Sequence, residues 1–131
     1  MKRLIYSLAL VVAVEATGAP AFAQQSRGLR VEFQGPGGHS SGAYGRVSAL
    51  HAAARAVILI QKALPAGSYQ ITNLTGGNSV NSIASDGLIE IKLTAANAAA
   101  YQALVAAVTK AAAEGAAAEN AFRGVKTGDL K

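Results

Sequence analysis

Alternating apolar and polar residues predict three β-strands in this chain. The range 29–33 places apolar residues at every second position, which is typical of a strand with one buried face. The ranges 68–74 and 87–93 repeat this two-residue period and predict a second and a third strand. The range 125–130 is the candidate for a short or incomplete last strand, because glycines interrupt the pattern there.

Two longer segments repeat apolar residues at helical spacing. The first follows a glycine-rich loop and ends at Pro65-Ala66-Gly67, and the second is the alanine-rich range 95–118. The predicted apolar stripes consist of Val47, Leu50, Ala54, Val57, Ile58 and Leu64 in the first helix, and of Tyr101, Leu104, Val105, Val108 and Ala112 in the second. The many small side chains of the second helix predict either a close approach to the sheet or a weak core.

The order of these elements predicts an α+β fold. The order β-α-β-β-α-β is that of a ferredoxin-like two-layer sandwich, in which two helices lie on one face of a four-stranded antiparallel sheet. Right-handed crossovers give the strand order 4-1-3-2, with a short or incomplete fourth strand. The strand at 68–74 then forms an exposed edge, which can pair with another chain unless something blocks it.

The first 23 residues read as a signal peptide rather than as part of the fold. Lys2 and Arg3 precede the apolar range 4–14, and Ala21-Phe22-Ala23 matches a cleavage site. A retained membrane anchor is the alternative. The predicted organisation is a signal peptide at 1–23, a polar leader at 24–28 and one domain at 29–131. The expected location is periplasmic or secreted, without membrane contact after cleavage.

Composition excludes several classes of function. The chain contains no cysteine, so disulfides and thiolate chemistry are excluded. Cleavage would leave ten basic and six acidic side chains, and the basic ones are scattered along the chain. This pattern does not predict a nucleic-acid footprint. The exposed strand positions carry charged residues instead of the aromatic residues of an RNA-binding sheet.

Two polar loops carry the candidate chemistry. The range 35–42 presents His39 and two serines, and the range 76–83 presents Asn81. A serine nucleophile beside His39 is a weak alternative, because adjacent residues rarely align for proton transfer and no orienting carboxylate is evident. Asn81 has a structural alternative as a residue that closes a turn. His51 is more simply interpreted as a hydrogen-bonded packing residue than as a metal ligand.

These loops resemble those of a known family. The motif Gly35-Pro36-Gly37-Gly38-His39-Ser40, the helix after it, and Gly76-Gly77-x-x-x-Asn81-Ser82-Ile83 resemble the lid, or dimerisation, domain of the di-zinc metallopeptidases. That family includes glutamate carboxypeptidase, aminoacylase, succinyl-diaminopimelate desuccinylase and peptidase T. The likeness extends over the range 28–123.

The resemblance implies roles for four residues and a mode of association. His39 would stabilise the oxyanion of a tetrahedral intermediate in a neighbouring subunit's active site. Asn81 would assist substrate binding, together with Gly76 and Gly77 in the same loop. A homodimer would form through the edge strand 68–74 and a helix.

The sequence also departs from that family. Ala84 stands where the family usually has proline, and Lys92-Leu93-Thr94 contains no arginine to grip a substrate carboxylate. The ligands for a zinc pair are missing, because neither histidine begins a His-x-Asp pair and no Glu-Glu pair exists. We therefore expect no metal site and no cofactor in this chain, with zinc only in the absent catalytic domain.

Three functional hypotheses follow. The chain is an exported dimerisation domain of the peptidase family that is not catalytic by itself. Alternatively, it is a fragment or trans-acting subunit that completes a zinc-dependent aminoacyl or peptide amidohydrolase formed with a separate catalytic chain. The third hypothesis is a degenerate, truncated gene product.

Overall fold

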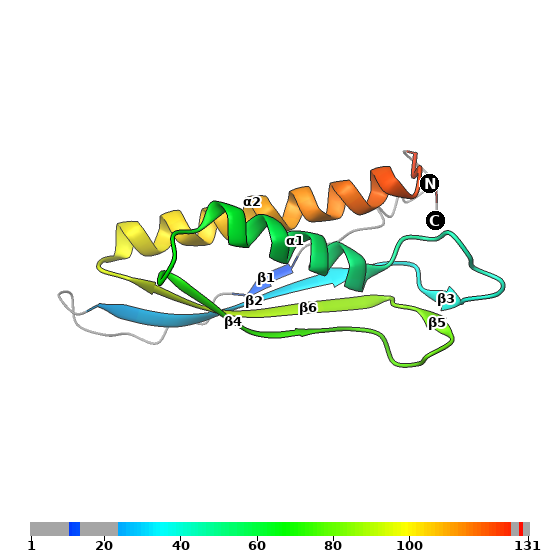
Figure 1. Cartoon of the computed structure of the whole chain (residues 1–131), viewed down its shortest axis with the longest axis horizontal. Coiled ribbons are helices and arrows are strands. Elements are labelled where there is room, and N and C mark those ends of the chain that lie inside the picture. The colour runs from blue at the N-terminus through cyan, green and yellow to red at the C-terminus, as the bar shows by residue number, and fades with distance from the viewer. Residues whose placement is uncertain (1–10, 14–23, 127–128, 130–131) are drawn as a thin grey trace, which may run out of the picture.

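Two helices cover one face of a four-stranded antiparallel sheet, as Figure 1 shows. The computed structural model describes residues 11–13, 24–126 and 129. The sheet consists of β1 (Val11–Ala13), β2 (Gln25–Gln34), β6 (Asp86–Ala95) and β4 (Tyr69–Thr75), in that spatial order. The helices are α1 (Ala49–Ala63) and α2 (Ala98–Phe122), and a small ribbon of β3 (Gly38–His39) and β5 (Ser82–Ile83) extends from one end of the sheet. The predicted α+β, ferredoxin-like fold is therefore confirmed.

The fourth strand of the sheet is not the predicted one. Val125 and Lys126 lie outside any strand, and residues 127, 128 and 130 of the predicted strand lie outside the described residues. The position beside β2 is taken by β1 instead, with Val12 opposite Val31. The order 4-1-3-2 is thus correct for the three strands β2, β6 and β4 and wrong for the origin of the strand beside β2.

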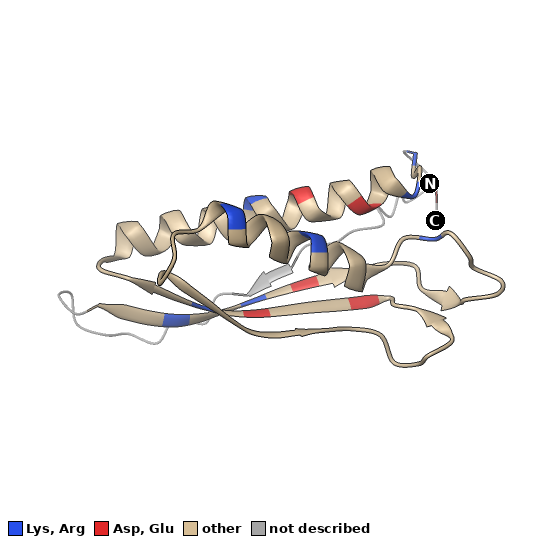
Figure 2. Cartoon of the chain, in the orientation of Figure 1, with Lys and Arg blue, Asp and Glu red and all other residues tan. Residues whose placement is uncertain are grey.

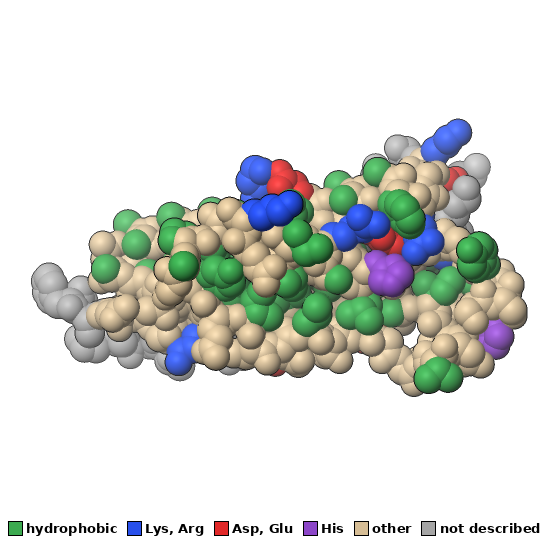
Figure 3. Space-filling model, viewed as in Figure 1, with side chains coloured by type: hydrophobic (Ala, Val, Ile, Leu, Met, Phe, Trp, Pro, Cys, Tyr) green, Lys and Arg blue, Asp and Glu red, His purple; other side chains and the backbone are tan. Residues whose placement is uncertain are grey.

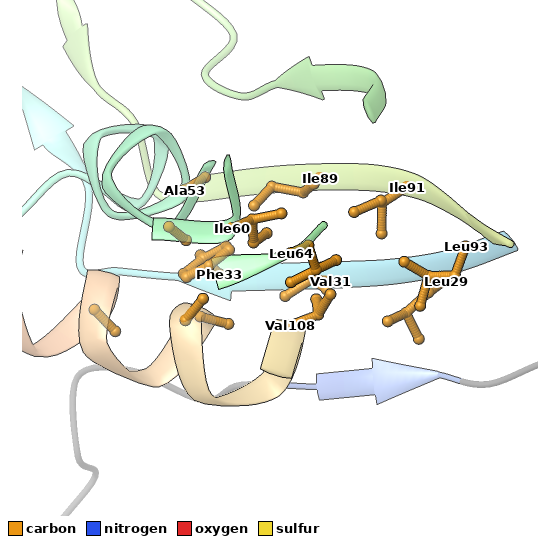
Figure 4. Packing of buried hydrophobic residues seen from close by; sticks show 14 of the residues in the cluster. Leu29, Val31, Phe33, Ala53, Ile60, Leu64, Ile89, Ile91, Leu93 and Val108 are labelled. Carbon is orange, nitrogen blue, oxygen red and sulfur yellow. The ribbon is translucent and has the colours of Figure 1, made fainter. Parts of the chain in front are cut away.

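The strands β2 and β6 form the centre of the sheet. They pair over ten residues, from Gln25 opposite Ala95 to Gln34 opposite Asp86. Most of the range 24–28, predicted as a polar leader, is therefore part of β2. The alternation predicted for these strands is confirmed, because Val31, Phe33 and the facing residues of β6 are buried beneath the helices. Figure 4 shows these side chains packed against α1 and α2. The main core residues are Leu29, Val31, Phe33, Ile60, Ile89, Ile91, Leu93 and Val108.

The first helix buries a narrower face than its sequence predicts. Side-chain hydrogen-bond acceptors cap both helices. Ser48 accepts from the backbone N–H of His51 at the start of α1, and Asn97 accepts from that of Ala100 at the start of α2. The buried residues of α1 are Ala49, Ala52, Ala53, Ala56 and Ile60. Ile58, predicted to be buried, is 52% exposed. The predicted stripe of larger residues is therefore wrong at this position.

Small residues allow the two helices to approach each other closely. A Cβ atom placed on Gly115 of α2 would lie 2.6 Å from the backbone nitrogen of Ala56 and 2.9 Å from the carbonyl oxygen of Ala52. Gly115 thus serves helix–helix contact, while Ala111, Ala112 and Ala116 belong to the core that α2 shares with the sheet. Within the described parts of the chain, neither helix combines the length and hydrophobicity needed to cross a lipid bilayer.

Candidate functional site

The β3–β5 ribbon brings the two polar loops together. His39 lies opposite Ser82 in the ribbon, and the backbone N–H of Ser40 donates to the carbonyl oxygen of Asn81 at 2.9 Å. His39 and Asn81, 42 residues apart in the sequence, thereby become neighbours. The ribbon lies beyond the end of the main sheet in Figure 1, so both side chains are exposed.

Glycines give the two loops their backbone path. Gly37 and Gly77 have φ angles of 61° and 75°, in the left-handed region that favours glycine. A Cβ atom on Gly76 would lie 2.4 Å from the carbonyl oxygen of Asp86, so this position requires glycine for close backbone approach. The side chain of Asp86 accepts from the N–H of Gly77 at 3.3 Å. These contacts shape the loop, and the part of Gly76 and Gly77 in substrate binding stays a prediction.

The imidazole of His39 is held from both sides. Its Nδ1 atom lies 3.2 Å from the backbone nitrogen of Ser41 and 2.8 Å from the Ser41 hydroxyl oxygen. A backbone N–H can only donate, so Nδ1 is an acceptor and the neutral ring carries its proton on Nε2. The Nε2 atom lies 3.2 Å from the Nδ2 atom of Asn81.

The side chain of Asn81 completes this hydrogen-bonded chain. Its Oδ1 atom accepts from the Ser79 hydroxyl, while its Nδ2 atom faces His39. Because Nε2–H and the Nδ2 amide group are both donors, the acceptor that suits Nε2–H is the amide oxygen of Asn81. Rotating the amide by half a turn pairs Oδ1 with Nε2 and Nδ2 with the Ser79 hydroxyl oxygen. In either orientation, Nε2 is the atom of His39 that a ligand can reach by replacing Asn81. The arrangement can therefore present one exposed N–H donor to an anionic oxygen.

The hydroxyl of Ser41, two residues after His39, contacts the imidazole. The alternative of a serine nucleophile therefore has a serine and a histidine in contact. No carboxylate contacts the His39 ring within residues 24–126, and the other ring nitrogen faces an amide. The local turn also includes the Ser41 backbone N–H, which is typical of a side chain that caps its own loop. A structural role explains this contact best.

The positions that match the missing family arginine lie far from the ribbon. Asp86 begins β6 beside the ribbon, whereas Thr94 lies near the other end of β6 and pairs with Ser26. The Thr94 and Ser26 hydroxyl oxygens are 2.9 Å apart. Within one chain, the fold therefore does not bring Lys92, Leu93 or Thr94 to His39.

A buried carboxylate between the helices was missed by the sequence analysis. Glu119 of α2 is 1% exposed and accepts from the Nε atoms of Arg55 and Arg123, each at 3.0 Å. It also accepts from the backbone N–H of Ser48 at the start of α1 at 3.2 Å. Figure 2 shows acidic positions on the C-terminal half of α2 and basic positions on α1. This cluster ties the end of one helix to the beginning of the other.

Two opposing effects set the pKa of Glu119. Burial alone would raise this pKa, because desolvation penalises the charged form. The hydrogen bonds from Arg123, the Ser48 backbone and Arg55, with the charge of Arg123, outweigh burial, so the pKa lies below the ordinary glutamate value. Glu119 and Arg123 are four residues apart, a spacing that could have suggested this ion pair. No sequence signal links Glu119 to Ser48, 71 residues away.

His51 lies beside this cluster. Its Nδ1 atom accepts from Arg123 at 3.3 Å, so the predicted hydrogen bond is present. Its side chain is exposed, so His51 is not a buried packing residue. Figure 3 shows one histidine beside a group of charged side chains, the other at the end of the molecule, and a hollow between them. Within the part of the chain that the structure describes, no three His, Cys, Asp or Glu residues are placed to hold a metal ion.

Comparison with known proteins identifies the family of this chain. The family model of the peptidase dimerisation domain matches residues 24–120. A search of curated protein sequences gave no match. Among solved structures, the chain is similar to a hydantoinase/carbamoylase family amidase from Burkholderia ambifaria, with 25% identity and a TM-score of 0.66 over 76% of this chain and 26% of that one.

Two other solved structures share the fold. An aminobenzoyl-glutamate utilization protein from Klebsiella pneumoniae has 21% identity and a TM-score of 0.66, over 79% of this chain and 30% of that chain. A hydantoinase/carbamoylase family amidase from Burkholderia multivorans has 23% identity and a TM-score of 0.62, over 76% and 26%. The chain thus spans less than a third of the length of these proteins. Because the family model covers most of the sequence, this chain belongs to the peptidase dimerisation domain family.

Proposed function

We propose that this chain is an exported dimerisation module that is not catalytic by itself and pairs with a second copy through β4 and α1. The observation that carries this proposal is the state of the β4 edge. Within the described residues, β4 pairs only with β6 and is the outermost strand of the sheet. The strand carries no charged residue and no proline, which are the usual means of blocking an edge.

Exposed apolar side chains accompany this edge. Leu74 on β4 is 40% exposed and Ile58 on α1 is 52% exposed. Fully burying a side chain of this kind contributes about 1.5–3 kcal/mol. A two-fold interface would bury Leu74 and Ile58 of both copies. Strand addition would extend the sheet while the two α1 helices cover the joint.

A β-bulge limits how the edge can pair. The register between β4 and β6 shifts between Ile71 and Asn73, and the Thr72 hydroxyl donates to the carbonyl oxygen of Glu90 at 3.1 Å. A bulge bends its strand and increases the local twist. Pairing with a second copy would therefore use one of the two segments on either side of Thr72 rather than the whole strand.

Export is the second part of the proposal. Lys2, Arg3 and the apolar range 4–14 precede the Ala21-Phe22-Ala23 site, and the family match begins at the next residue, 24. Among the side chains that the structure describes, the buried hydrophobic core lies between Leu29 and Ala116. The chain after residue 23 thus retains the whole of that core.

Sedimentation of residues 24–131 tests the dimer. We expect a reversible dimer at micromolar concentration, and we expect Ile58→Glu to shift it to monomer because two charges would be desolvated in the interface. Val80→Glu is the matched control, since Val80 is fully exposed in the loop before β5 and belongs to neither β4 nor α1. A monomer at high micromolar concentration, or equal dissociation in both variants, contradicts the proposal.

The contact between His39 and Asn81 favours a second candidate function. The exposed Nε2 donor of His39 suits an oxyanion in another chain's active site, so the module would complete a zinc-dependent amidohydrolase in trans. A zinc-binding catalytic chain encoded beside this one would be the partner. With the two chains mixed, we expect His39→Ala to lower kcat about 100-fold or more. Unchanged activity of that variant would remove this candidate.

A further inference from the structure

A mixed cationic and apolar cleft opens between the ribbon and the beginning of α1. Its volume is about 410 Å³, and its walls come from the loops before α1 and before β5, from the start of α1 and from Arg123 after α2. His39 and Asn81 are not among its lining residues. Gly76 and Gly77, for which the family resemblance implies a part in substrate binding, do line it, so the cleft lies beside His39 and Asn81 without including them.

The charged side of the cleft is basic. Arg46, His51 and Arg123 line it, and no carboxylate of residues 24–126 is among its lining residues. Glu119 lies behind Arg123, but its oxygens already accept from Arg55, Arg123 and the Ser48 backbone. The cleft thus keeps a net positive charge.

Of the two arginines that line the cleft, Arg46 is the less engaged by other side chains. Its Nη1 atom donates to the carbonyl oxygen of Gly37 at 3.2 Å, and within residues 24–126 it forms no ion pair. A second hollow of about 380 Å³ is lined by Arg46 and Arg123 as well, so solvent reaches this pair of arginines from two sides. A guanidinium with free N–H groups binds carboxylates in a bidentate manner.

The other side of the cleft is apolar. Leu50, Ile83 and Ala84 line its interior. Tyr44 and Val80 lie on its two bordering loops with 92% and full exposure, the highest values among the large apolar side chains of the described residues. Exposed apolar side chains that border one hollow often mark a binding site.

From these features we infer that the cleft binds a small organic carboxylate with an apolar tail. The carboxylate contacts Arg46, with the charge of Arg123 beside it, and the tail lies against Leu50 and Ile83. Tyr44 and Val80 cover the tail from the two loops. The pairing of one anionic group with one short apolar group follows from the two sides of the cleft.

Titration of the full chain with 4-methylpentanoate, followed by ¹H–¹⁵N NMR, tests the inference. We expect saturable shifts at the amides of Gly45, Arg46, Gly77 and Ser82. Arg46→Gln removes the charge-assisted hydrogen bonds and weakens binding about tenfold. Val80→Asp, a change at a fully exposed position, weakens binding by charge repulsion without removing any internal contact of Arg46.

The controls separate the carboxylate from the tail and from general charge. Lys62→Gln removes an exposed basic residue from the far end of α1 and leaves the affinity unchanged. The neutral analogue 4-methylpentanamide and inorganic phosphate each bind at least about tenfold more weakly, because each lacks one of the two features. Equal binding of either analogue, full binding by Arg46→Gln, or shifts confined to other parts of the chain would overturn the inference.

Discussion

Hydrogen bonds to neighbouring side chains orient the Nε2–H donor of His39 on an exposed loop. The Nδ1 atom of His39 is satisfied by Ser41, so the ring has one orientation in which both nitrogens have partners. A ligand oxygen that replaces Asn81 at Nε2 exchanges one hydrogen bond for another, and one such bond is worth about 0.5–1.5 kcal/mol net. The ring therefore requires little reorganisation to donate to an anion.

The residues of this site could be predicted only in part. His39 was a candidate because a glycine-rich loop exposes its side chain, and Asn81 because it matches the motif of the resembling family. The sequence could not predict the contact of Ser41 with His39, because that contact depends on the backbone of one turn. Glu119 escaped prediction for a different reason, since two of its partners, Ser48 and Arg55, come from α1, 64 or more residues away.

At the scale of the helices, Gly115 decides how closely α1 and α2 approach. Helix propensity alone predicts that Gly115→Ala stabilises the protein by about 1 kcal/mol. The added Cβ would instead lie 2.6 Å from the Ala56 backbone nitrogen, which cannot move without displacing α1. We expect a net loss of about 1–3 kcal/mol in the free energy of unfolding, measured by urea denaturation.

A substitution in the same helix provides the comparison. Ala113 is exposed on α2, so Ala113→Gly reports helix propensity without a packing change and should cost about 1 kcal/mol. The two substitutions exchange the same residue types in opposite directions, and both are expected to destabilise. A stabilised Gly115→Ala variant would show that the helices can separate at no cost.

The helices also show which features the hydrophobic pattern of a sequence can and cannot predict. Their positions were predicted within about four residues, because both repeat apolar residues at helical spacing and Pro65-Ala66-Gly67 marks the end of the first. The buried face of α2 was predicted, because Tyr101, Val108 and Ala112 are buried. The buried face of α1 was not, since an alanine face and a face of larger residues compete along that helix. The larger residue Ile58 remains exposed because Ala52 and Ala56 are the residues small enough to meet Gly115.

For the molecule as a whole, the outer edge of the sheet depends on a short segment. The strands β2, β4 and β6 were predictable because each has several alternating positions and the crossovers have one hand. The strand beside β2 was not, because Val11–Ala13 is too short for a periodic signal. Removal of the first 23 residues would open this edge while the core between Leu29 and Ala116 stays intact.

The stability of the whole domain should depend on pH through Glu119. Its pKa is lower in the folded chain than the unfolded value of about 4.3, so the folded state favours the carboxylate. This contribution is complete above the unfolded pKa and is lost as the pH falls through the folded pKa. We expect Glu119→Gln to lower the free energy of unfolding by about 2–4 kcal/mol at pH 7, because Arg55 and Arg123 lose a buried partner.

Urea denaturation of both proteins between pH 7 and pH 3 measures this effect. The difference between wild type and Glu119→Gln should shrink toward acidic pH, because protonation removes from the wild type the same charge that the substitution removes. Glu114→Gln is the matched control, since Glu114 is an exposed residue of α2 whose ion pair with Lys110 is worth less than about 1 kcal/mol. If the difference between wild type and Glu119→Gln stays constant across this range, ionised Glu119 is not what joins α2 to the start of α1.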